Sequence, residues 1–183
     1  MRYAQVRSMD ISNGEGIGVS LFVQGCPFNP HCKNCFNPDT WDFNGGKEWT
    51  QDTEDKLIEL ANKPYIKRLS ILGGEPLADE NLDGVLHLVN RFRLSFPNKT
   101  IWLYSGYTWN QVINPVITDD FNPSRDELLD KRKEIVKQCT VMVDGRYIDS
   151  QRDVNLKWRG SKNQRVIDIK QSLQKGKVTL WTE

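Results

Sequence analysis

The sequence has neither a long apolar segment nor an excess of charge of one sign. No stretch approaches the ~20 apolar residues of a membrane-spanning helix, and Met1–Val6 lacks the apolar segment of a signal peptide. The 25 Lys and Arg residues are balanced by 24 Asp and Glu residues, so charge favours neither nucleic acid nor an anionic membrane as the main partner. We therefore expect a cytoplasmic protein whose partners are other proteins.

Cysteine is also scarce, with four residues in 183, and its distribution argues against a disulfide framework. Cys26, Cys32 and Cys35 fall close together, whereas Cys139 stands alone in an apolar run. Thiols grouped in this way in a reducing compartment usually bind metal.

Short segments rich in β-branched and aromatic residues predict strands, and helical patterns lie between them. Alternation of strand and helix implies right-handed crossovers and a mostly parallel sheet. The strand and helix pairs are too few for a complete eight-fold barrel of ~250 residues. The sequence therefore predicts an α/β fold, a partial, open (β/α) barrel formed by residues 1–183 as a single domain. Strands are expected at 19–23, 69–72, 101–104, 140–143 and 166–169, and helices at 55–62, at 82–92 and after a capping box at 124–127.

Three segments with Pro, Gly and polar residues are expected to be loops around a working face. They are residues 36–49, 114–123 and 145–164. The final residues, 171–183, fit either a short extra strand or a tail.

The three grouped cysteines follow directly on the first predicted strand, at the end where α/β active sites are built. Three thiolates can bind three irons of a cubane and leave the fourth iron open for chemistry. A structural zinc site, completed by His31 or Cys139, is the alternative, although the sequence holds no second Cys-x-x-Cys pair. The spacing favours an iron–sulfur cluster and leaves zinc open.

A glycine motif, Ile-Leu-Gly-Gly-Glu-Pro at residues 71–76, ends the second predicted strand on the same rim as the cysteines. Gly73 and Gly74 allow close approach of the backbone to a ligand, and Glu75 suits an ammonium group. Ordinary turns also contain Gly-Gly and Pro, so the motif is informative only together with the cysteines.

Together, a cysteine triad after one strand and Gly-Gly-Glu-Pro after the next resemble the radical S-adenosylmethionine enzymes, whose fold is a partial, open barrel. The sequence is most similar to one family among them, the activating proteins of the anaerobic (class III) ribonucleoside-triphosphate reductase. This resemblance covers about residues 1–170, although five residues separate Cys26 from Cys32 where many members have three. The added residues are expected to bulge outward. The similar segments are residues 10–16, 20–26, 35–41, 102–107, 143–146 and 158–165.

The resemblance implies one [4Fe-4S] cluster per chain, held by the three cysteines, with S-adenosylmethionine bound at the fourth iron. It also implies contacts to S-adenosylmethionine from the segment around the third cysteine and from the glycine motif. The implied residues are Cys26, Cys32 and Cys35 for the catalytic cluster, and Asn34, Cys35, Phe36, Gly73, Gly74 and Glu75 for S-adenosylmethionine.

The reaction implied by the resemblance begins with an electron from a flavodoxin or a ferredoxin-type donor. Reductive cleavage of S-adenosylmethionine gives a 5′-deoxyadenosyl radical, which takes hydrogen from a glycine of the reductase and leaves a glycyl radical. The rival functions are activation of a different glycyl-radical protein, a small-molecule radical synthase, and a zinc-stabilised binding module.

Four further residues at strand ends and in the last loop are candidates for ligand contacts. Ser105 and Asp144 follow the third and fourth predicted strands and are expected to contact the ribose or the methionine moiety. Arg159 and Arg165 are candidates for binding the methionine carboxylate or the reductase.

Overall fold

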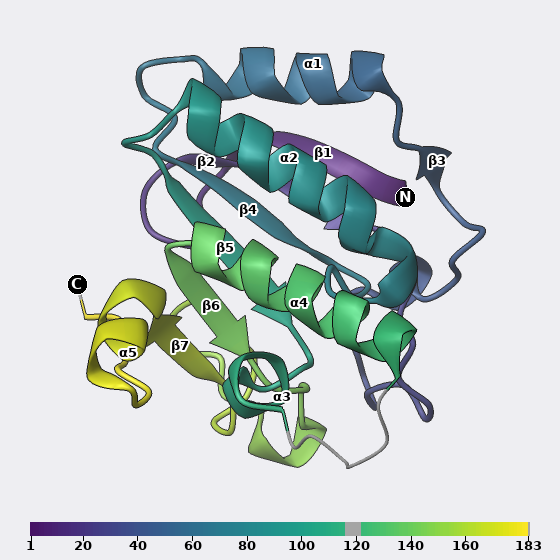
Figure 1. Ribbon diagram of the computed structural model, residues 1–183, viewed down its shortest axis with the longest axis vertical. Helices are drawn as coiled ribbons and strands as arrows, with labels where there is room; N and C mark the ends of the chain where they lie inside the picture. Colours follow the sequence, from purple (N-terminus) through teal and green to yellow (C-terminus); the bar gives the residue numbers. More distant parts are fainter. Residues whose placement is uncertain (116–121, 183) are drawn as a thin grey trace.

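The computed structural model describes residues 1–115 and 122–182 and shows a seven-stranded sheet with α1, α2 and α4 side by side across one face (Figure 1). The sheet order is β3-β1-β2-β4-β5-β6-β7. The strands are β1 (Arg2–Asp10), β2 (Gly18–Val23), β3 (Lys47–Glu48), β4 (Arg68–Gly73), β5 (Thr100–Ser105), β6 (Val141–Asp144) and β7 (Arg165–Asp168). The helices are α1 (Gln51–Ala61), α2 (Leu82–Ser95), α3 (Trp109–Ile113), α4 (Pro123–Gln138) and α5 (Ile169–Lys175). Short 3₁₀ turns occur at η1 (Pro38–Thr40), η2 (Asp79–Asn81) and η3 (Asp149–Gln151).

The centre of the sheet is parallel, as the sequence predicts, because β2, β4, β5 and β6 pair in parallel. The edges are antiparallel: β1 pairs with β2 and with β3, and β7 pairs with β6. The sheet is not closed, since β3 and β7 stand at its two ends. The α/β class and the open sheet are thus confirmed, and the radical S-adenosylmethionine barrel type stays a prediction.

The β1 strand was not expected from the sequence. Its residues are mostly polar, and half of it is exposed, so it carries no apolar run that predicts a strand. Tyr3 and Val6 are its apolar residues that pack against the core. Pairing with the buried β2 therefore decides its conformation, and the same holds for the two-residue β3 inside the predicted loop at 36–49.

The predicted capping box at 124–127 is wrong as the start of α4. The helix begins at Pro123, and the Asn122 side chain accepts the Arg125 N–H at 3.2 Å. Proline suits the first helical position because its φ is fixed and its missing N–H needs no partner there. Of the loop predicted at 114–123, residues 116–121 lie outside the described residues.

The last segment, predicted as a short strand or a tail at 171–183, begins as a helix instead. The helix α5 occupies residues 169–175. Asp168 caps it by accepting the Gln171 N–H at 2.8 Å, and Gly176 ends it with a φ of 65°. Leu180 then forms an isolated bridge with Ile167, so a short part of the last segment does extend the sheet.

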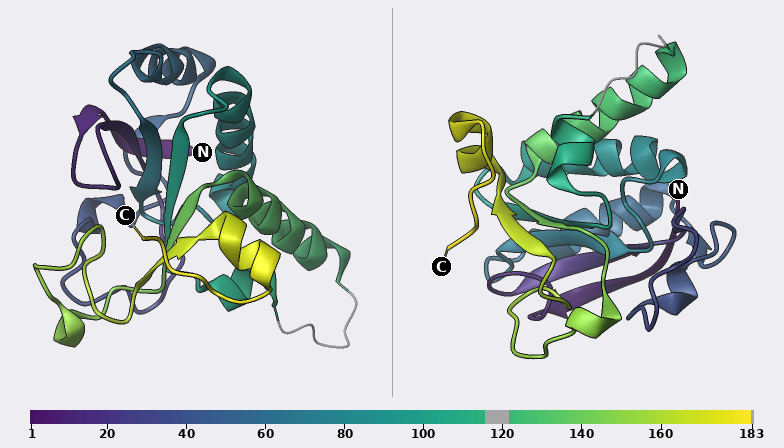
Figure 2. Two further views of the ribbon diagram at one scale, coloured as in Figure 1. Left: turned by 90° about the vertical axis from the view of Figure 1, so that its left-hand side faces the viewer. Right: turned by 90° about the horizontal axis from the view of Figure 1, so that it is seen from below.

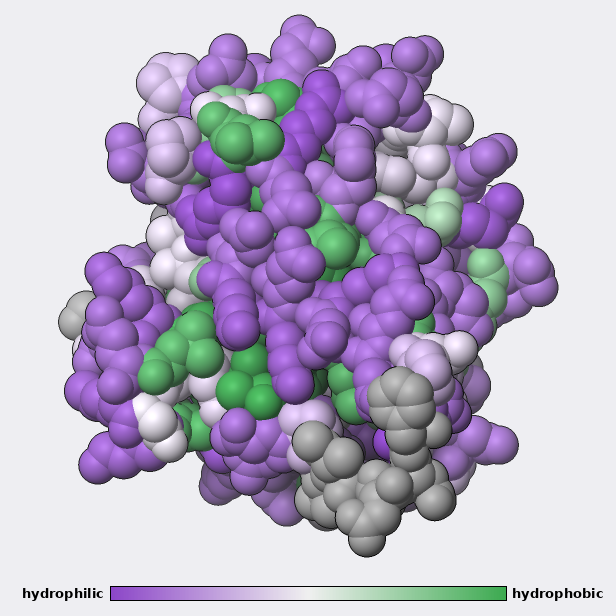
Figure 3. All heavy atoms as spheres, in the orientation of Figure 1, coloured by the Kyte–Doolittle hydropathy of each residue, from purple (hydrophilic) through white to green (hydrophobic). Residues whose placement is uncertain are grey.

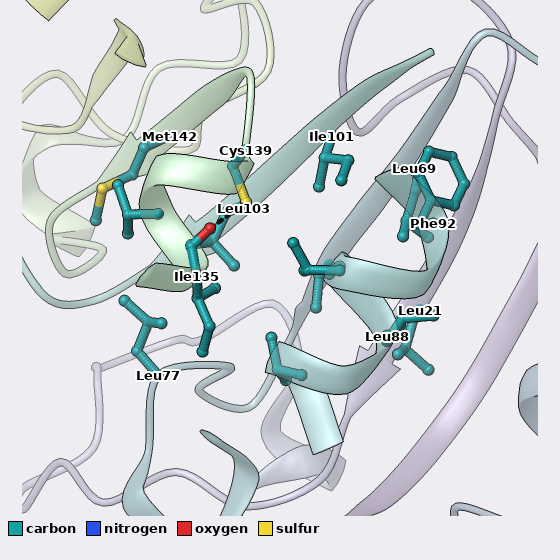
Figure 4. Close-up of a cluster of buried hydrophobic side chains, with 14 of the residues drawn as sticks. Leu21, Leu69, Leu77, Leu88, Phe92, Ile101, Leu103, Ile135, Cys139 and Met142 are labelled. Atoms are coloured by element: carbon teal, nitrogen blue, oxygen red, sulfur yellow. Dashed lines mark hydrogen bonds between the residues drawn. The ribbon is translucent and has the colours of Figure 1, made fainter. Parts of the chain in front are cut away.

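The main hydrophobic core lies between the sheet and the helices (Figure 4). Alternate residues of the central strands point into this core: Leu21 and Leu69 lie beside Leu88 and Phe92 of α2, and Leu103 lies beside Ile135 of α4 (Figure 4). This burial follows from the period of two along strands and of three to four along helices.

The opposite face of the sheet buries polar groups as well as aromatic rings. Arg68 is completely buried and donates to Asp10 Oδ1 at 3.0 Å and to Ser70 Oγ at 2.5 Å. Burial on its own raises the pKa of Asp10, but hydrogen bonds from Asn13, Arg68 and Ser12 outweigh it and lower the pKa overall. The stability that Asp10 contributes is therefore present at neutral pH and is lost as the pH falls through its lowered pKa.

Replacing Arg68 with methionine should lower the free energy of unfolding by ~3–5 kcal/mol, because the buried Asp10 carboxylate would keep only the long ion pair to the half-exposed Arg7, 3.8 Å away. Urea unfolding followed by tryptophan fluorescence measures this loss. The double variant R68M/D10N should regain part of it, and a single-variant loss below ~1 kcal/mol would show that the pair is not needed.

The outer surface of the helical layer is mostly polar. Over α1, α2 and α4, the face in Figure 3 is largely hydrophilic with scattered apolar spots. Within residues 1–115 and 122–182, the helices are too short or too polar to cross a membrane.

Candidate functional site

One cavity of about 530 Å³ collects most of the residues that the sequence singled out. The central strands β2, β4, β5 and β6 run in parallel toward it, and the loops that follow them form its wall. One of these loops, the β6–β7 loop, lies on the side of the sheet away from α2 and α4 (Figure 2). The three cysteines, the glycine motif and Ser105 therefore meet in one place.

The chain turns sharply between β2 and the cysteines. Gly25 has a φ of 95°, a conformation that favours glycine, and a Cβ there would collide with the ring of Phe43. The Cys35 N–H donates to the Cys32 carbonyl at 3.2 Å, which closes a turn between these two ligand candidates. All three cysteines are free, half-buried thiols that line the cavity.

The three thiols influence one another electrostatically. The pKa of the Cys26 thiol is raised to about 11, first by burial and then by the negative charges of Glu75, Cys32 and Cys35. A thiol in this environment ionises when a bound metal compensates its charge, so iron loading would release protons. The donor set of three soft thiolates around one space fits an iron–sulfur cluster.

Neither of the two residues that could complete a zinc site, His31 and Cys139, lines the cavity. In the described part of the chain, no three His, Cys, Asp or Glu side chains are arranged to hold a single metal ion. Cys139 is buried at the end of α4, where its Sγ donates to the Ile135 carbonyl, and it does not line the cavity. The His31 ring stacks on Trp41 with 4.2 Å between ring centroids. A cubane differs from zinc because each thiolate binds a separate iron.

The long segment between the first two cysteines is held by aromatic contacts. Phe28 packs on Tyr107, with ring centroids 5.1 Å apart, and lies 5.0 Å below the Arg146 guanidinium. Gly106 leaves the space for this ring, because a Cβ there would collide with Phe28. Asn29 and Pro30 are exposed, as expected of added residues that bulge outward.

Replacing Phe28 with alanine should speed the loss of iron from the reconstituted protein by roughly 2–10-fold, because an aromatic pair contributes about 0.5–1.5 kcal/mol. Iron release to a chelator under anaerobic conditions measures the effect. The matched control is Phe96→Ala, since Phe96 also has an aromatic partner and a cation–π contact but lies away from the cavity. Equal iron release from F28A and the wild type would rule out this anchoring role.

The glycine motif packs directly on the strand end that leads into the cysteine loop. Gly73 has a φ of 117°, and a Cβ on Gly74 would collide with the Gly25 carbonyl. The Gly74 and Glu75 N–H groups donate to Val23 O at 3.0 Å and Gly25 O at 2.7 Å. Glycine is required here for close approach of two backbones, and both glycines also line the cavity.

Glu75 is the buried carboxylate of the site, with 1% of its surface exposed. Its oxygens accept the Leu77 N–H at 2.9 Å, the Ser105 hydroxyl at 2.8 Å and the Gly106 N–H at 2.7 Å. Burial raises its pKa to about 7, although these hydrogen bonds oppose the shift. Ser105 thus reaches the site as predicted and also anchors Glu75.

The other predicted contact residues differ in their placement. Phe36 lines the cavity, with its ring 4.9 Å from that of Tyr147. Asn34 is exposed, lies outside the cavity lining and donates to Asp149 Oδ2 at 3.0 Å. Asp144 is buried beside the cavity, where Arg165 and a backbone N–H occupy its oxygens. Contacts from these residues to a ligand stay predictions.

Of the two predicted arginines, Arg159 lines the cavity and donates to the Gln164 carbonyl at 2.6 Å. Arg165 is held by Asp144 at 2.5 Å, so its guanidinium is already paired. Arg7 and Arg146, which the sequence did not single out as candidates, also line the cavity. Arg146 directly follows Asp144-Gly145 at a strand end, a position that could have signalled it, whereas Arg7 lies in the unexpected β1.

Comparison with known proteins identifies an iron–sulfur domain in this chain. The family model described as a 4Fe-4S single cluster domain matches residues 12–167. The chain is 39% identical over 166 residues to the anaerobic ribonucleoside-triphosphate reductase-activating protein of Vibrio cholerae, covering 90% of this chain and 96% of that one. Proteins with the same description from Escherichia coli K12 and Enterobacteria phage T4 are 37% and 33% identical, covering 90% and 91% of this chain and 96% and 93% of theirs.

Proposed function

Because this chain belongs to the family of the anaerobic ribonucleoside-triphosphate reductase-activating proteins and has its 4Fe-4S single cluster domain, we propose that it activates such a reductase by radical chemistry. The proposed reaction is reductive cleavage of S-adenosylmethionine, followed by formation of a glycyl radical on the reductase. One observation carries the proposal: three cysteine thiols and the Gly-Gly-Glu motif line the same cavity.

In this reaction, one electron from a flavodoxin or a ferredoxin-type donor breaks the bond between the sulfonium sulfur and C5′ of the adenosyl group. Methionine leaves, and the 5′-deoxyadenosyl radical takes a hydrogen atom from the reductase glycine. The products are 5′-deoxyadenosine and a glycyl radical. The [4Fe-4S] cluster, when bound by Cys26, Cys32 and Cys35, supplies the electron.

The residues of the chain supply binding, orientation and exclusion of water. The ionised Glu75 carboxylate is proposed to receive the ammonium group of S-adenosylmethionine beside Gly73 and Gly74. Arg159 and Arg146 are the cavity cations proposed to bind the methionine carboxylate. Free thiols of this kind persist in a reducing compartment, which supports a cytoplasmic location for the reaction.

The test is anaerobic reconstitution with iron and sulfide, followed by reduction with dithionite and addition of S-adenosylmethionine. We expect 5′-deoxyadenosine and methionine in equal amounts, and a glycyl radical signal by electron paramagnetic resonance when the reductase is present. If four irons are bound but no 5′-deoxyadenosine forms, the proposed chemistry is wrong.

A further inference from the structure

More than half of the large apolar side chains that are exposed in the described residues belong to segments that line the cavity. Within the part of the chain that the structure describes, nine such side chains are exposed. Five of them line the cavity or lie within two residues of a lining residue. These five are Met9, Ile11, Phe36, Ile148 and Val154. Exposed apolar groups gathered in one region mark binding surfaces more often than isolated ones do.

Four of these residues form what we call the rim: Met9, Ile11, Ile148 and Val154. They belong to β1, to the β1–β2 loop and to the β6–β7 loop, which lie toward opposite ends of the sheet. Both loops nevertheless line the same cavity, the first through Ser12 and Asn13 and the second through residues 156–160. Each rim residue therefore lies within two positions along the chain of a residue that lines the cavity. Ile11 and Val154 are 76% and 80% exposed, so neither is used in the core.

The mouth is also cationic. Arg146 and Arg159 donate to the backbone carbonyls of Pro30 and Gln164, and among the described residues neither forms an ion pair with a carboxylate. Arg152 lies on the same loop, with its guanidinium 5.7 Å from the Phe36 ring centroid. S-adenosylmethionine carries two positive groups and one carboxylate, so it cannot neutralise this excess. A partner with carboxylates can.

We propose that the rim and Arg152 dock the protein substrate, a segment of the reductase that carries the reacting glycine and presents apolar side chains flanked by carboxylates. This inference rests on the proposed function and names its partner surface. Apolar contacts would supply affinity, and Arg152 would steer the acidic segment toward the cavity. A protein substrate explains why apolar groups stay exposed beside a site for a small polar ligand.

The experiment measures binding of the purified reductase to the reconstituted protein by anaerobic calorimetry. Val154→Glu and Ile11→Glu should each weaken binding by at least ~10-fold, since buried apolar anchors dominate interfaces. Both should leave 5′-deoxyadenosine formation without the reductase unchanged. The matched control is Leu94→Glu, because Leu94 is 86% exposed on α2 and lies outside the cavity and its rim. Wild-type binding should weaken as salt is raised, and Arg152→Glu should reduce that salt dependence.

Equal binding by V154E, I11E and the wild type, or equal weakening by L94E, would overturn the docking surface. If the rim variants bind normally while the wild type cleaves S-adenosylmethionine, only this inference fails. If the rim variants lose binding but no protein cleaves S-adenosylmethionine, the docking surface stands and the proposed chemistry fails.

Discussion

Cys32→Ala is expected to abolish the formation of 5′-deoxyadenosine. Cys32 lies in the middle of the loop that carries the thiols, and its carbonyl accepts the Cys35 N–H at 3.2 Å. Its loss leaves two thiols at the cavity, which is too few to hold three irons of a cubane. The iron content after reconstitution should fall below four per chain, and the absorbance of the iron–sulfur cluster should be lost.

The matched control for this variant is Cys139→Ala. Cys139 is the remaining cysteine, and its side chain is buried at the end of α4 against the Ile135 carbonyl. This variant should lose some stability but keep four irons and normal cleavage of S-adenosylmethionine. Full iron loading and normal activity of C32A would contradict the assignment of the ligands.

The sequence predicted the buried parts of the fold well, because burial leaves a local pattern. The central strands are apolar on the helix-facing side, and their ends fall within one residue of the expected ones. β1 escaped prediction because its neighbour β2, rather than its own polar sequence, makes it a strand. The start of α4 was misplaced by two residues, since Asn122 and Ser124, two positions apart, both suit a helix N-cap.

In the site, too, residues in short local motifs could be predicted, whereas residues brought together by long-range contacts could not. The cysteines and the glycine motif could be found because their spacing along the chain is short and carries the chemistry. The bond from Ser105 to Glu75 and the pairing of Arg165 with Asp144 join residues 30 and 21 positions apart, and no local pattern encodes them. Arg146 reaches the cavity only because the β6–β7 loop folds back over the cysteine segment, where it donates to the Pro30 carbonyl.

Glu75, which accepts a hydrogen bond from Ser105, is expected to make the binding of S-adenosylmethionine depend on pH. Because its carboxylate is buried and its pKa is raised to about 7, protonation near neutral pH is coupled to whatever cation it binds. An ammonium group beside it would stabilise the ionised form and lower the pKa again. Binding of S-adenosylmethionine should therefore weaken as the pH falls below about 7, since the neutral carboxyl no longer attracts the ammonium group.

Glu75→Gln should raise the dissociation constant for S-adenosylmethionine by roughly 10–100-fold above neutral pH, because a charge-assisted hydrogen bond contributes about 1.5–3 kcal/mol. The variant should also lose the pH dependence of binding, since the glutamine amide does not titrate. Equilibrium binding to the reconstituted, unreduced protein at about pH 6 and about pH 8 measures both effects on either side of the raised pKa.

Glu54→Gln is the control for a change that acts only through folding. Glu54 is also a buried carboxylate, held by Trp49, His87 and Arg91, but it lies on α1 and not in the cavity lining. Its variant should lose stability while binding S-adenosylmethionine with the wild-type pH dependence. If E75Q binds within about twofold of the wild type at both pH values, Glu75 serves only to hold Ser105 and the Gly106 N–H, and the ammonium group is bound elsewhere. If the binding of S-adenosylmethionine is weakened only in E75Q, and in the wild type at low pH, the ionised Glu75 carboxylate is the group that recognises the ammonium group of the ligand.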